Sequence, residues 1–171
     1  MQHGTMKRND MYLSRRGVIP MQQWKTMCQE YILRNRRPVV RPRLGMAEII
    51  PEEAEAYLNQ HRAQSFHQQL FAFIDRTGKS DSDVYKKGNI DRRLFSKIRN
   101  RDYIPAKKTV IALCLALGLN RSDADLLLQS AGYSLSKSDD YDLAIAFCIE
   151  KGIYDIFDIN EILYHFGFET F

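Results

Sequence analysis

Nine cationic side chains are concentrated between Ser80 and Lys108, where only four acidic residues accompany them. They are Lys86, Lys87, Arg92, Arg93, Lys97, Arg99, Arg101, Lys107 and Lys108. Guanidinium and ammonium groups bind phosphate oxygens, and a guanidinium also fits the acceptor edge of guanine. These residue types therefore favour binding of a polyanion, although the same charges could form the solvated face of an ordinary helix.

The residues around these cations predict how they are positioned. Ser80 and Asp83 have the spacing of a capping box, which predicts the start of a short helix. Gly88 and Asn89 predict a tight turn at its end, and Asp91 is an N-cap residue for a second, cationic helix. The residues expected on the buried side of that helix are Ile90, Phe95 and Ile98. A helix that is apolar on one face and cationic on the other is suited to lie in a DNA groove, or to cover an acidic protein partner.

Further helices are predicted on both sides of this segment, from apolar residues at spacings of three and four or from helix-start signals such as Pro51 with the acidic residues that follow it. They cover residues 21–33, 51–64, 65–78, 109–119, 126–131, 141–149 and 158–166. Residues 109–119 are apolar almost all round, which predicts a buried helix. No stretch alternates apolar and polar residues over several positions, so we expect no strand and an all-α fold.

The chain is expected to divide into a basic N-terminal arm, residues 1–50, and a helical domain, residues 51–171. We expect the arm to be partly flexible, with one short amphipathic helix over residues 21–33. Pro38 and Pro42 interrupt any helix beyond it. The arginines of this linker are Arg34, Arg36, Arg37, Arg41 and Arg43. The linker is either a solvated tether or an arm that contacts phosphates.

Charge is distributed unevenly along the chain. Residues 1–50 carry +7, residues 51–79 carry −1, residues 80–108 carry +5 and residues 109–171 carry −7, which gives +4 in all. Such asymmetry indicates an electrostatic partner for the basic part, and a polyanion is the simplest one. The acidic C-terminal region could instead pair with the basic arm, or cover the cationic helix through Asp139, Asp140, Asp142 and the rest of the acidic tail.

No pattern typical of catalysis or metal binding is recognisable, neither a Gly-rich phosphate loop nor GxSxG nor HExxH. The four histidines, His3, His61, His67 and His165, are too scattered to suggest metal ligands. The three cysteines, Cys28, Cys114 and Cys148, are widely spaced, and we expect them to be structural thiols. We therefore expect no enzymatic activity, no metal and no cofactor.

The sequence also bears on location. No apolar run approaches the roughly 18 residues of a membrane helix. The N-terminal basic residues are not followed by an apolar core of signal-peptide length. We expect a cytoplasmic protein without a membrane partner.

The segment IDRRLFSKI, Ile90 to Ile98, followed by the apolar helix ending in LALGLN, resembles the lambda-repressor-like (Xre-type) helix-turn-helix family. The resemblance spans about Phe66 to Leu128 and places a helix-turn-helix core at residues 66–130. With the downstream AGYSLS and YDIFDINEILYHF, the chain is similar to an Xre-like module of bacterial proteins. That module often follows another domain, including ADP-ribose-binding macro domains, but the first 60 residues here are too few for one.

The resemblance implies roles for the cationic residues. Asp91, Arg92 and Arg93 would open a recognition helix that faces a groove of double-stranded DNA, with Lys97 one turn further along. Arg99 and Arg101 would complete the DNA-binding set. The residues implied to approach phosphates are Lys86, Lys87, Lys107 and Lys108.

Four positions depart from the family pattern. Tyr85 stands where a small residue is usual, and Gly88 stands where a large apolar residue is usual, so the two could compensate. Asn89 replaces a turn glycine, which is compatible with left-handed backbone geometry. Leu94 occupies a position that normally points outward, where it could touch a thymine methyl or another domain.

Three functional hypotheses remain open at this stage. The first is a DNA-binding transcriptional regulator or DNA-targeting module, which could dimerise through its fifth helix or its aromatic C-terminal region. The second is a protein-interaction module that kept the fold without DNA binding. The third is RNA binding through the Arg-rich linker, with Trp24 or Tyr31 stacking on bases.

Overall fold

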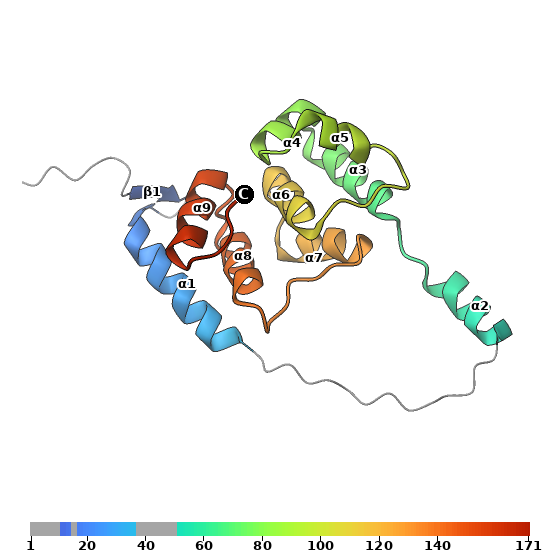
Figure 1. Cartoon of the computed structure of the whole chain (residues 1–171), viewed down its shortest axis with the longest axis horizontal. Coiled ribbons are helices and arrows are strands. Elements are labelled where there is room, and N and C mark those ends of the chain that lie inside the picture. The colour runs from blue at the N-terminus through green and yellow to red at the C-terminus, as the bar shows by residue number, and fades with distance from the viewer. Residues whose placement is uncertain (1–10, 15–16, 37–50) are drawn as a thin grey trace, which may run out of the picture. The chain divides into compact units, whose positions relative to one another are not determined.

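The computed structural model describes residues 11–14, 17–36 and 51–171. Within them lie nine helices and one two-stranded hairpin (Figure 1). The strands are β1 (Met11–Ser14) and β2 (Gly17–Pro20), and the first helices are α1 (Met21–Asn35), α2 (Pro51–His61) and α3 (Phe66–Thr77). The others are α4 (Asp81–Lys87), α5 (Arg92–Ile98), α6 (Lys107–Leu117), α7 (Arg121–Ser130), α8 (Asp140–Lys151) and α9 (Ile156–His165). The expected all-α class is confirmed.

The expectation that the chain has no strand is wrong for β1 and β2. The two strands pair antiparallel, with Met11 opposite Pro20 and Ser14 opposite Gly17. Each strand has only four residues. Such short strands give too few positions for an alternating pattern to stand out, which is why sequence reasoning missed them.

One compact unit combines the described residues up to Arg36 with Leu135–Phe171. Its helices are α1, α8 and α9, which pack against one another (Figure 1). α1 buries Met21, Trp24, Cys28 and Ile32, at the predicted spacings of three and four. The rings of Trp24 and Tyr31 both meet Phe147 of α8 edge-on, with centroids 6.2 and 5.7 Å away.

This grouping differs from the expected boundary at residue 50. The amphipathic helix expected in the N-terminal arm is present as α1, but it belongs with the C-terminal helices, because its apolar stripe packs on α8. Arg36, expected in a cationic linker, forms an ion pair with Asp140 at 3.3 Å. Arg37, Arg41 and Arg43 lie outside the described residues.

The second compact unit runs from residue 37 to Ser134 and contains α2 to α7. α6 is buried along most of its length, as its apolar sequence predicted, and it contacts α3, α4 and α7. The expected capping box of Ser80 with Asp83 is present, and Ser65 forms a second capping box with Gln68 at the start of α3. Gly78 ends α3 with a φ of 64°, in the left-handed conformation that glycine adopts at little cost.

Two polar contacts tie helices of the second unit together. The Arg76 guanidinium donates to Asp123 at 2.6 Å and joins α3 to α7. Lys79, between α3 and α4, donates from Nζ to the carbonyl of Ala116 near the end of α6, at 2.7 Å. Burial lowers the pKa of Lys79, with the nearby charge of Lys87 adding to the effect. These contacts help fix the frame in which α5 is held.

Candidate nucleic-acid interface

A tight turn sets the direction of α5 relative to α4. The N–H of Gly88 donates to the carbonyl of Val84 at 2.9 Å, and the N–H of Ile90 donates to the carbonyl of Tyr85 at 2.8 Å. Asn89 between them has a φ of 50°, the left-handed conformation that its residue type tolerates. The expected tight turn is confirmed, and it brings Ile90 into the core, where its side chain is 8 % exposed.

The unusual pair Tyr85 and Gly88 has a packing explanation. A Cβ atom at Gly88 would lie 3.2 Å from the carbonyl oxygen of Ala112 in α6 and 3.1 Å from the Cδ1 atom of Ile90. Glycine therefore lets the end of α4 approach the backbone of α6. Tyr85 is half-buried, with its ring 5.8 Å from that of Phe95. The large residue thus packs on α5, while the small one allows close contact with α6.

α5 presents different faces to the core and to solvent. Asp91 is its N-cap, and its Oδ1 accepts from the N–H groups of Arg93 and Leu94 at 2.8 and 3.2 Å. Phe95 and Ile98 are buried, and burial of each side chain contributes roughly 2 kcal/mol. The cationic residues Arg92, Arg93 and Lys97 are exposed, and within the described residues none of their three side chains has a hydrogen bond or an ion pair.

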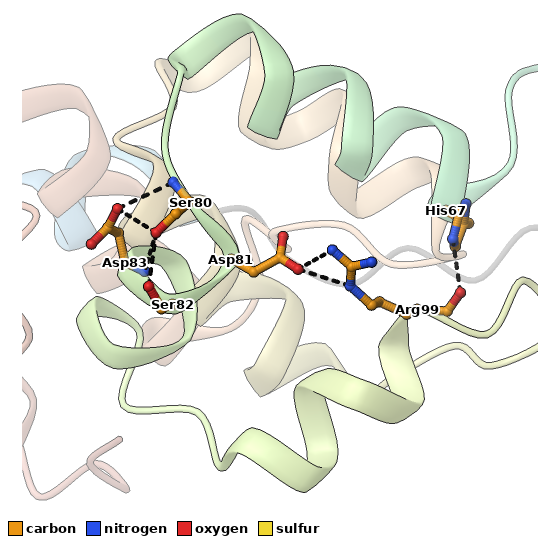
Figure 2. A network of polar contacts seen from close by, with 6 residues as sticks. All are labelled: His67, Ser80, Asp81, Ser82, Asp83 and Arg99. Atoms are coloured by element: carbon orange, nitrogen blue, oxygen red, sulfur yellow. Dashed lines mark hydrogen bonds and ion pairs between the residues drawn. The ribbon is translucent and has the colours of Figure 1, made fainter.

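Arg99 is placed differently from the other cations of the predicted set. Its guanidinium forms an ion pair with Asp81 in the first turn of α4 and lies 5.5 Å from the centroid of the Phe71 ring. The carbonyl of Arg99 accepts a hydrogen bond from Nε2 of His67, in the first turn of α3, at 2.9 Å. Figure 2 shows Arg99 between Asp81 and His67. Arg99 therefore links the end of α5 to α3 and α4.

This linkage was missed in the sequence because each residue type had another explanation there. Asp81 lies in the first turn of α4, where an acidic residue is already favoured by the helix dipole. Arg99 counted as one more cation of a basic helix. Only the fold brings Asp81 and Arg99, 18 residues apart, within hydrogen-bond distance.

The other predicted contact residues flank α5 along the chain. Lys86 and Lys87 lie in the last turn of α4, and both are exposed. Lys107 and Lys108 lie in the first turn of α6 and are half-buried. Arg101, in the loop after α5, is exposed. The predicted set thus occupies three successive elements of one unit.

The three carboxylates considered as a cover for the cationic helix have local partners instead. Asp139 is the N-cap of α8 and accepts from the N–H of Asp142 at 3.0 Å. Asp140 pairs with Arg36. Asp142 is 2 % exposed, and its carboxylate accepts from the N–H of Ser136 at 2.7 Å.

Base stacking on the predicted aromatic residues is not supported by their placement. Trp24 is only 4 % exposed, and its ring packs against Phe147. Tyr31 packs on the same ring, and its hydroxyl donates to the carboxylate of Glu150. The RNA-binding hypothesis therefore loses the stacking surface on which it depended.

Comparison with known proteins gives no relative for this chain: no protein-family model, curated protein or solved structure matches it significantly.

Among the described residues, no helix is both long and apolar enough to span a bilayer. Within the same residues, no group of three or more His, Cys, Asp or Glu side chains is arranged to hold a metal ion.

Proposed function

We propose that the chain is a double-stranded DNA-binding protein of the Xre-type, lambda-repressor-like helix-turn-helix class, acting as a transcriptional regulator or a DNA-targeting module. α4 and α5 would form the helix-turn-helix pair, and α5 would be the recognition helix. One observation carries the proposal. Arg92, Arg93 and Lys97 are exposed on α5, while its opposite face is anchored in the core.

The proposal assigns different roles to the cations. Arg92, Arg93 and Lys97 reach base edges, because guanidinium and ammonium groups match the acceptors of guanine. Phosphates are contacted from both sides of α5, and this fixes the register of the protein on the duplex. The phosphate-contacting residues are Lys86, Lys87, Arg101, Lys107 and Lys108. Asp91 acts as the N-cap of α5, and Arg99 acts as a positioning residue through Asp81.

The test is binding of a random-sequence duplex, measured by fluorescence anisotropy at about 50 and 200 mM salt. If about six phosphates are contacted, the affinity should fall roughly a thousandfold between these concentrations. The variant Arg92→Ala/Arg93→Ala/Lys97→Ala should lose binding. The control variant Lys25→Ala/Lys137→Ala/Lys151→Ala removes the same number of positive charges from the other unit, and it should still bind the duplex. Absence of binding at low salt, or equal losses in the two folded variants, would refute the proposal.

A second candidate function is protein interaction through the C-terminal helices. Phe157 and Tyr164 of α9 are 81 % and 80 % exposed. They are seven residues apart, so they lie on one face of the helix. Exposed aromatic residues of this kind are typical of interface anchors. If a second copy of the chain binds there, sedimentation analysis should show a dimer that Phe157→Ser/Tyr164→Ser dissociates.

A further inference from the structure

Helix α2 has no packing partner among the described residues. Its side chains from Glu53 to His61 are exposed, as is the connection to α3. Tyr57 and Leu58 are each 62 % exposed. Within the described part of the chain, no hydrogen bond, ion pair or ring contact joins α2 to another helix. The ring contact that Tyr57 does make is within its own helix, where it stacks on His61 with ring centroids 3.9 Å apart.

An exposed helix of this length needs a surface to pack on. Isolated helices shorter than about 12 residues are marginal in water, and most helices in proteins are stabilised by packing of their apolar face. α2 has 11 residues. Tyr57 and Leu58 are the large apolar side chains that such packing would cover. Glu53 is four residues before Tyr57 and Glu55 is three before Leu58, so a carboxylate flanks each of them.

The exposed face of α5 has complementary properties. Within the described residues its Arg92, Arg93 and Lys97 side chains form no ion pair, and the half-buried Leu94 lies at the edge of this face, beside Lys97. An apolar face with carboxylates beside it matches an apolar side chain with cations beside it, and such complementarity favours one register over others. The acidic residues Asp139, Asp140 and Asp142 have hydrogen-bond or ion-pair partners within their own unit.

The connection between α2 and α3 is long enough for the two helices to meet. The first turn of α3 lies at the C-terminal end of α5, because His67 donates to the carbonyl of Arg99 at 2.9 Å (Figure 2). The five residue steps from His61 to Phe66 span up to about 17 Å when extended. α5 is about 10 Å long, and Glu53 is about 12 Å from His61 along α2. With the C-terminal ends of the two helices together, Glu53 and Glu55 would lie beside Arg92 and Arg93.

We propose that α2 covers the exposed face of α5 in the same chain and competes with DNA for it. The competition with DNA rests on the proposed function, whereas the contact between the helices does not. A short tether holds α2 at a high effective concentration, so weak ion pairs suffice to populate the covered state. The apparent DNA affinity is then reduced by the fraction of molecules in which α5 is covered.

The contact is tested by paramagnetic relaxation in the full chain. A nitroxide attached at Ser96→Cys, an exposed position of α5, should broaden the amide signals of α2. The native thiols, Cys28, Cys114 and Cys148, are buried, so the label goes to the new cysteine. The broadening should be lost in Glu53→Gln/Glu55→Gln and kept in Glu30→Gln/Glu161→Gln, a control with the same change of charge in the other unit.

DNA binding is measured in parallel on the same variants without the label. Glu53→Gln/Glu55→Gln should bind a random duplex about threefold to tenfold more tightly than the unaltered chain. The control variant should change the affinity by less than about twofold, because exposed charges at a distance are screened.

The outcomes separate the two proposals. Absence of broadening at α2 overturns the inferred contact. Broadening that occurs only when a labelled copy without isotope is mixed with an unlabelled, isotope-enriched copy also overturns it, because the contact is then between two molecules. Broadening within one chain together with equal DNA affinities of the variants overturns the competition. Broadening without DNA binding by any variant at low salt supports the contact and refutes the proposed function instead.

Discussion

Removal of the Arg99 side chain should reveal whether this residue would bind DNA itself or positions α5, the helix proposed to bind it. The guanidinium pairs with Asp81 and lies 5.5 Å from the centroid of the Phe71 ring. The two charged side chains are 58 % and 29 % exposed, so solvent screens the pair. Such a pair contributes about 0.2 to 1 kcal/mol, and a cation over an aromatic ring at an exposed site adds about 0.5 kcal/mol. Arg99→Ala should therefore lower the free energy of unfolding by about 1 kcal/mol.

The DNA-binding measurement should separate the two roles. If Arg99 positions α5, Arg99→Ala weakens binding by a similar factor at every salt concentration, because no phosphate contact is lost. Arg93→Ala, which removes an exposed cation, serves as the comparison. If Arg93 binds a phosphate, that variant should also reduce the slope of log affinity against log salt by about 1.

Asp81→Ala makes the test sharper. It removes a negative charge, so simple electrostatics predicts tighter DNA binding, whereas loss of the contact that holds α5 predicts weaker binding and lower stability. We expect the weaker binding, measured by anisotropy alongside urea unfolding. The positioning role would be refuted if Asp81→Ala bound more tightly and Arg99→Ala lost about one unit of salt slope.

Three further predictions concern stability and reactivity. Burial, with Asp155 and Glu161 nearby, raises the pKa of Asp158 to about 6. Because this exceeds the unfolded value of about 4, the stabilisation from Asp158 is complete below about pH 4 and is lost as the pH rises through 6. In urea unfolding, Asp158→Asn should be more stable than the unaltered chain at pH 7 and equal to it near pH 4. Gly88→Ala should destabilise the fold by about 1 to 3 kcal/mol in the same assay, since the added methyl lies 3.2 Å from the Ala112 carbonyl oxygen. All three cysteines are buried and burial raises the pKa of each thiol, so a thiol reagent should modify them only under denaturing conditions; rapid labelling of the native chain would contradict this.

Local signals predicted the elements well because each depends on neighbouring residues. Ser80 and Asp91 were recognised as caps from their residue type and spacing, and the structure confirms both. The predicted helix over residues 65–78 likewise ends at Gly78, the C-cap of α3. In each case a side chain or backbone group satisfies the end of its own helix, so no distant contact is needed.

Contacts between distant segments could not be predicted in the same way. The apolar stripe of α1 indicated that the helix is buried, but nothing in it specified α8 as the partner. Arg99 had the residue type of a DNA contact, and only the fold shows its ion pair with Asp81. Amphipathicity gives the face that is buried, whereas the partner depends on topology.

The division into units also changes the interpretation of charge. Along the sequence, residues 109–171 carry a net charge of −7 and residues 80–108 carry +5. From these values alone, the acidic C-terminal region is expected to bind the basic helix. The unit formed by residues 1–36 and 135–171 contains nine basic and ten acidic residues, a net charge of −1. The unit formed by residues 37–134 contains sixteen basic and eleven acidic residues, a net charge of +5.

The acidic C-terminal region therefore belongs to a unit whose sequence carries a net charge of only −1, and the ion pair between Arg36 and Asp140 lies within this unit. The excess positive charge is confined to the unit that carries α5. A unit with unbalanced positive charge attracts a polyanion at long range, and that attraction weakens with salt. Within this unit, a short connection joins α2 to α3. Because α3 begins near the C-terminal end of α5, the exposed carboxylates of α2 can reach the cations of α5. For these reasons we propose α2 as the segment of the chain that competes with DNA for the cationic face.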